Sequence, residues 1–173
     1  MKKILIIVLT SISSFSVYSQ TELQGHIKSQ AEIMVNAFMH EQYDLLLDYT
    51  YPKIFAVTGG REVMRSLIEE MMTDLKTQGI TVDSAKVGEA GPIYTAGSEL
   101  HAIINQYVYM KIPDGKMISE SSLLAISMDK GSKWYYIDIA QLTPELKKEF
   151  FPEFNNDLVV PEPKQPVIIY DSE

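Results

Sequence analysis

The side chains best placed for chemistry are polar residues that interrupt the apolar faces of predicted strands. Gln106 breaks the aliphatic alternation of one long strand, and Glu120 and Ser122 share a face with aliphatic residues of the returning strand. Because strand side chains alternate between two faces, the three can meet in one cavity, with Tyr43 of a helix as a lid or donor. A carboxyl group in an apolar cavity has a raised pKa and could act as a general acid or base.

Two functions follow from this arrangement. In the first, Gln106, Glu120, Ser122 and Tyr43 line a ligand-binding pocket for a small apolar molecule, and no residue is catalytic. In the alternative, a cofactor-free isomerase, dehydratase or cyclase uses Glu120 as its acid/base, while Gln106 and Tyr43 orient a small apolar substrate. A β-bulge would shift the register and turn Glu120 and Ser122 to solvent. We favour the binding or interaction module over the enzyme.

Other catalytic and metal-binding patterns are missing from the sequence. It has no cysteine, no Gly-x-Ser-x-Gly motif, no P-loop and no Gly-x-Gly-x-x-Gly motif. His26, His40 and His101 lack metal-ligand spacing, so each is expected at the surface or at a helix end. We therefore expect no metal site and no cofactor.

The first nineteen residues are typical of a secretory signal peptide. Lys2 and Lys3 precede a short apolar segment, and residues 17–19 offer small side chains for cleavage before Gln20. The segment is too short and Ser-rich to span a membrane, so we expect an exported protein, periplasmic or extracellular, without membrane insertion after signal removal. Loss of the two lysines changes the net charge from −8 to −10, which disfavours nucleic acid as a partner.

Hydrophobic periodicity predicts an α+β fold in which three N-terminal helices pack on a curved antiparallel sheet. A short helix over residues 143–151 and an extended Pro-rich tail from Leu158 follow the sheet. Residues 54–57 read as a short strand or an irregular bridge. The expected helices cover residues 21–40, 42–49 and the segment between Gly60 and the capping Gly79, and the expected strands cover residues 80–87, 93–95, 100–112, 116–128 and 133–140.

A tight turn joins the last two predicted strands with the spacing Ser127-x-Asp129-x-Gly131-x-x-Trp134. The carboxylate can accept backbone N–H groups, and glycine tolerates a positive φ angle. The spacing resembles the Asp-box hairpin of sialidases and other β-propellers, in which it stabilises the fold and is not the catalytic site. It occurs once, so a propeller built from repeats is not supported. We expect a structural hairpin.

The order of elements over residues 21–140 resembles the nuclear transport factor two-like superfamily, which includes ketosteroid isomerases and polyketide cyclases. The segments 51–52, 59–62 and 78–80 (Tyr-Pro, Gly-Gly-Arg-Glu, Gln-Gly-Ile) are similar to uncharacterised exported members. This resemblance implies a cone-shaped fold with a pocket between the helices and the concave sheet face. The isomerases' Asp base and Tyr–Asp pair do not align with this chain, and Asp138 is more typical of a strand end.

Together these features divide the chain into a signal peptide (1–19), a nuclear transport factor two-like domain (20–140) and a C-terminal helix with tail (141–173).

Aromatic residues suggest a partner as well as a ligand. Tyr107, Tyr109, Trp134, Tyr135 and Tyr136 could form a patch on the outer sheet face, for a second copy or a carbohydrate. Cross-strand packing is the simpler interpretation. The partner hypotheses are therefore a small apolar ligand and a homodimer formed through the sheet.

Overall fold

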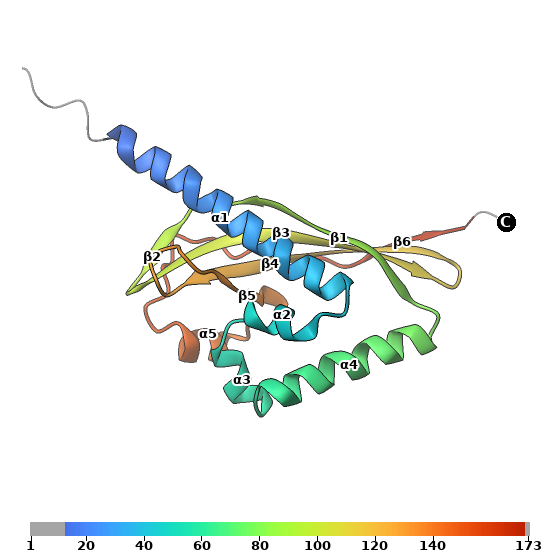
Figure 1. Cartoon of the computed structure of the whole chain (residues 1–173). Helices are drawn as coiled ribbons and strands as arrows, with labels where there is room; N and C mark the ends of the chain where they lie inside the picture. The colour runs from blue at the N-terminus through green and yellow to red at the C-terminus, as the bar shows by residue number, and fades with distance from the viewer. Residues whose placement is uncertain (1–12, 172–173) are drawn as a thin grey trace, which may run out of the picture.

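The chain folds into helices packed on one antiparallel sheet (Figure 1). The computed structural model describes residues 13–171 and contains, within that range, five α-helices and six strands, so the α+β class is confirmed. The helices are α1 (Ser13–Met39), α2 (Tyr43–Asp48), α3 (Lys53–Thr58), α4 (Arg61–Thr77) and α5 (Pro144–Phe150), and a 3₁₀ turn, η1, covers Ile139–Gln141. The strands are β1 (Thr81–Ala90), β2 (Tyr94–Ala96), β3 (Glu99–Ile112), β4 (Gly115–Ser127), β5 (Tyr135–Asp138) and β6 (Val167–Tyr170).

The sheet is organised around the long β3–β4 hairpin. Its strand order is β1-β3-β4-β5, with β2 paired to β3 and β6 paired to β4. β3 and β4 pair in one continuous register, in which Ile104 lies opposite Leu123 and Ile103 lies opposite Leu124. Because side chains of opposed residues share a face, the register assigns every residue of this hairpin to one side of the sheet.

Residues 53–58 form a helix, whereas a short strand or an irregular bridge was expected over residues 54–57. Pro52 precedes it with helical dihedral angles (φ −62°, ψ −29°), which preorganises the first turn. Gly59 ends it in the left-handed conformation (φ 92°) and donates its N–H to the Phe55 carbonyl. Four helices therefore precede the sheet in the described chain, instead of the three that were expected.

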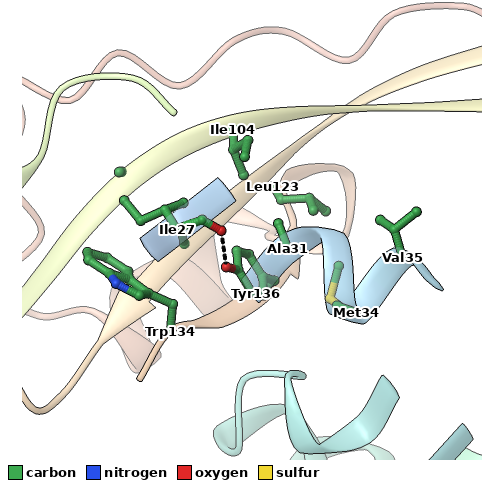
Figure 2. Close-up of a cluster of buried hydrophobic side chains, with 10 residues drawn as sticks. Ile27, Ala31, Met34, Val35, Ile104, Leu123, Trp134 and Tyr136 are labelled. Atoms are coloured by element: carbon green, nitrogen blue, oxygen red, sulfur yellow. Dashed lines mark hydrogen bonds between the residues drawn. The ribbon is translucent and has the colours of Figure 1, made fainter. Parts of the chain in front are cut away.

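The first hydrophobic core lies between α1 and one face of the sheet (Figure 2). The Tyr136 hydroxyl donates a hydrogen bond of 2.6 Å to the Ile27 carbonyl, which fixes α1 to β5. The buried members are Ile27, Ala31, Met34 and Val35 of α1, together with Ala102, Ile104, Leu123, Ala125, Trp134 and Tyr136.

A second core lies on the opposite face, under α3, α5 and the residues after α5. The Lys53 ammonium donates to the Phe150 carbonyl at 2.6 Å and so connects α3 to α5. Because Leu158 is buried here as well, the C-terminal segment belongs to the same packed body as the sheet. The buried members are Tyr51, Ile54, Leu124, Ile126, Ile137, Ile139, Phe150, Phe151 and Leu158.

The predicted signal peptide, residues 1–19, lies largely outside the described residues, and α1 begins within it at Ser13. Among the helices of residues 13–171, none combines the length and the apolar character that crossing a bilayer requires.

Candidate functional site

The polar residues selected from the sequence do not meet in one cavity. In the β3–β4 register, Gln106 lies opposite Ser121, whereas Glu120 lies opposite Tyr107 and Ser122 opposite Asn105. Gln106 therefore shares the face that carries α1, and Glu120 and Ser122 share the other face. The expected convergence is wrong because it joined the two strands with a register that is off by one residue.

Glu120 and Ser122 each have a nearby polar partner on their own face. A Glu120 carboxylate oxygen accepts from the Lys164 ammonium at 2.6 Å, and the Ser122 hydroxyl donates to the Asn105 side-chain oxygen at 2.9 Å. Both residues line a hollow of about 180 Å³ between β4, η1 and the proline-rich segment 161–164. Glu120 is thus in an ion pair with Lys164.

Tyr43 is the first residue of α2 and does not line this hollow. Its side chain is buried, and this burial raises the pKa of the phenol above its ordinary value. Lys76 and Glu69 of α4 are among the charges that act on it, so Tyr43 lies at the contact between α2 and α4. Its position makes it a packing residue of the helical layer.

An apolar pocket of about 190 Å³ lies where the helices meet the first face of the sheet. We call it the α4 pocket because three of its side chains, Met64, Ile68 and Met71, come from that helix. The remaining lining residues are Met34, Phe38, Leu46, Thr50 and Ile54 from the other helices and the loop after α2, and Leu123, Tyr136, Ile137, Asp138 and Gln141 from the sheet and η1.

The helix α4 is attached along its charged side and leaves much of its apolar side exposed. Arg61 binds Asp48 at 2.8 Å, Arg65 binds Asp44 at 2.9 Å and Lys76 binds Glu41 at 2.5 Å. These pairs are solvent-exposed and so contribute little stability each. In Figure 1, α4 runs along the outside of the helical layer, set apart from the sheet.

The apolar stripe of α4 is only partly covered. Met72 is the buried residue of α4, whereas Leu67 and Met71 keep 49% and 47% of their surface exposed. The unbranched side chains of methionine adapt their shape to a ligand at low cost. The α4 pocket therefore has a wall whose shape can adjust.

The polar groups of the α4 pocket are few and lie at its sheet side. Asp138 ends β5, and its carboxylate accepts from the Ala140 N–H at 2.8 Å, which makes it the cap of η1. Thr50 donates its hydroxyl to the Leu46 carbonyl at 3.2 Å. Both side chains thus have structural partners, and the pocket offers mainly apolar contact.

The turn between β4 and β5 forms the hydrogen bonds that the Asp-box spacing suggests. Asp129 Oδ1 accepts from the N–H groups of Ser132 and Lys133 at 3.1 and 2.9 Å, and the Ser127 oxygen accepts from Gly131 N at 2.8 Å. The hydrogen bond from Lys133 N is the main cause that lowers the pKa of Asp129. Gly131 has φ 98°, a conformation that favours glycine.

Trp134 joins this hairpin to α1. It is fully buried, and its indole N–H donates to the Gly131 carbonyl at 3.1 Å. Gln30 of α1 accepts from Trp134 N at 2.9 Å and donates to the Ser132 carbonyl at 2.9 Å. The hairpin is thus a structural joint between the sheet and the first helix.

The environment of His101 differs from the expected one. It was expected at the surface, but it is 1% exposed and lies on the second face of β3. Its Nε2 lies 3.0 Å from a Glu99 carboxylate oxygen, and its ring packs 5.0 Å from that of Phe151. Nδ1 is buried without a hydrogen-bond partner, and burial lowers the pKa of the imidazole.

A pattern in the sequence points to this position. His101 alternates with Ala102 and Ile104, so it falls on the face of Ile103, and the run 150–154 supplies three phenylalanines to cover that face.

In the described chain no group of three or more His, Asp or Glu side chains is arranged to hold a metal ion.

The five aromatic residues proposed as one outer patch lie on both faces of the sheet. Trp134 and Tyr136 are buried in the first core, at 0% and 2% exposure. Tyr107, opposite Glu120, and Tyr135, opposite Ile126, lie on the second face. The five residues therefore do not form one patch, which was the less favoured of the two interpretations, because the last strand alternates between the two cores.

Comparison of the chain with family models, curated protein sequences and solved structures finds no match to any of them.

Proposed function

We propose that this protein is an exported, non-catalytic binding domain of the nuclear transport factor two-like type, and that it holds a small apolar ligand in the α4 pocket. The observation that carries the proposal is the pocket itself, an apolar space of about 190 Å³ between helices and sheet with a half-exposed wall on α4. Pockets that bind small molecules are concave and mostly apolar, with few polar groups.

The composition of the pocket supports an apolar ligand over a charged one. Most of its side chains are aliphatic, aromatic or methionine, and its carboxylate, Asp138, already accepts a hydrogen bond from Ala140 N. Burial of apolar ligand surface stabilises a complex by about 25 cal/mol per Å². Glu120, the acid/base residue of the alternative enzyme hypothesis, does not line this pocket and pairs with Lys164 on the other face of β4.

Export is supported by the basic and apolar N-terminal residues of the sequence. The superfamily assignment is supported by the order of the elements, with the helical layer before a long antiparallel sheet.

The proposal is tested with N-phenyl-1-naphthylamine, an uncharged probe whose fluorescence rises in apolar surroundings. We expect saturable binding by the wild-type protein. Met71→Glu places a charge in the pocket wall and is expected to weaken binding about tenfold or more, because an apolar ligand bound there would take water away from the carboxylate. Leu67→Glu is the matched control, since Leu67 lies on the same helix, is equally exposed and does not line the pocket.

Equal loss of binding in both variants, or no saturable binding by the wild type, would overturn the proposal. Circular dichroism spectra of the two variants establish that both remain folded, so that a loss of binding is assigned to the pocket.

A further inference from the structure

The C-terminal strand β6 is an exposed apolar edge of the sheet. It pairs on one side with the first residues of β4, from Gly115 opposite Tyr170 to Ile118 opposite Val167. Its four residues, Val-Ile-Ile-Tyr, are between 45% and 70% exposed. Figure 1 shows β6 beside the turn end of the β3–β4 hairpin, away from α1.

Apart from its short length, this edge lacks the features that normally keep a strand from pairing with another chain. Monomeric proteins keep edge strands very short or protect them with charged side chains, prolines, bulges or a covering loop. Within 167–170 there is no charge and no proline, and the pairing with β4 continues without a register shift. Exposure of all four side chains means that, within the described chain, nothing covers the strand.

The strand is held closely against β4, which makes it a defined edge. Gly115 lies directly against the Ile169 carbonyl, where a side chain would collide with the β6 backbone. Asp171 N donates to the Asp114 carbonyl at 3.0 Å and extends the pairing by one residue.

That last hydrogen bond determines which backbone groups face outward. In an antiparallel pair, residues alternate between bonding toward the partner and pointing away from it. Because Asp171 bonds toward β4, Ile169 and Val167 do so as well, and Ile168 and Tyr170 direct their N–H and C=O groups to the open edge.

We propose that two copies of this protein pair through β6 in an antiparallel, twofold-symmetric arrangement with Ile169 on the axis. In this register Ile168 bonds with the partner's Tyr170, and Tyr170 with the partner's Ile168, so all outward groups of the strand are used. A register centred on Ile168 would instead place Tyr170 opposite Pro166, which has no N–H to donate.

The side chains favour the same register. It sets Ile168 beside the partner's Tyr170, and pairs of β-branched with aromatic residues stabilise antiparallel sheets. Ile169 meets its own copy in a non-hydrogen-bonded pair, where Cα atoms are about 4.5 Å apart and side chains are in close contact. A second copy is the occupant that matches this edge in direction, length and apolar character at once.

The experiment is a disulfide trap in a protein whose sequence contains no cysteine. Ile169→Cys is expected to form a covalent dimer rapidly under mild oxidation with diamide, because Cα atoms about 4.5 Å apart lie within disulfide range. Ile168→Cys is the register control, since the two copies of that residue lie diagonally, about 7–8 Å apart, and should cross-link slowly. Val159→Cys, an exposed apolar residue outside the strand, should remain monomeric on denaturing gels.

Sedimentation of the uncross-linked protein completes the test. The wild type is expected to sediment as a dimer at micromolar concentrations, and Ile169→Lys, which sets two like charges opposite each other, as a folded monomer. A monomeric wild type, a dimeric Ile169→Lys variant, or cross-linking that is no faster at 169 than at 168 and 159 would overturn the proposal.

Discussion

The hairpin at residues 127–134 and the α4 pocket are built in opposite ways. In the hairpin, side-chain oxygens of Asp129, Ser127 and, from α1, Gln30 accept hydrogen bonds from backbone N–H groups, and Trp134 is fully buried. At the pocket, α4 is held by exposed ion pairs, and its apolar residues are half covered. The difference indicates that the hairpin fixes the fold, whereas α4 leaves room for a ligand.

The largest expected effect separates the two regions by stability. Trp134→Ala removes a buried indole and is expected to lower the free energy of unfolding by about 3–5 kcal/mol. Met71→Ala, in the half-exposed pocket wall, should change it by about 0.5 kcal/mol or less. Urea unfolding followed by circular dichroism measures both, and similar losses in the two variants would contradict the contrast.

A smaller effect is expected from the hairpin carboxylate. Asp129→Ala removes the acceptor of two exposed N–H groups, those of Ser132 and Lys133, and should cost about 0.5–1.5 kcal/mol in the same unfolding measurement. Asp157→Ala is the control, because that exposed carboxylate accepts no hydrogen bond in the described part of the chain. If both variants unfold alike, the turn does not depend on its carboxylate.

The buried histidine of the second core should make stability depend on pH. Burial lowers the pKa of His101, so the unfolded chain binds more protons than the folded one below the ordinary value of about 6.5. The stability from neutral His101 is therefore present above about pH 6.5 and is lost as the pH falls toward the folded pKa. The charged and titratable groups around it are Glu99, Lys53, Tyr51 and Glu153.

His101→Gln keeps a donor toward Glu99 and removes the titration, so its unfolding free energy should vary less between pH 7.5 and pH 5 than that of the wild type. His40→Gln, at an exposed helix end, should retain the full dependence. An unchanged pH profile in His101→Gln would assign the acid sensitivity to other groups.

The same contrast explains which features could be predicted from the sequence. The helices, the alternating strands and the hairpin turn depend on residues close together in the chain, and their periodicity or spacing is visible directly. The segment 53–58 was ambiguous because four apolar residues fit a strand or a helical turn equally well, and the flanking Pro52 and Gly59 decided the outcome.

The candidate site was not predictable in the same way, because it depends on contacts between distant segments. A register that differs by one residue moves Glu120 and Ser122 to the opposite face from Gln106, and no local pattern fixes that register. His101 is buried only because Phe151 and Phe154, about fifty residues later, cover it. The α4 pocket likewise depends on distant segments, because residues of α1, α4, β4 and β5 line it together.

Hydrogen exchange of the wild-type protein, with and without N-phenyl-1-naphthylamine, tests the central claim most directly. We predict that amides of α4 exchange much faster than those of β4 and the 127–134 hairpin in the free protein, and that the probe slows exchange in α4 and leaves the hairpin unchanged. Equal protection of α4 and the hairpin in the free protein, or a probe effect outside the α4 pocket, would contradict the account.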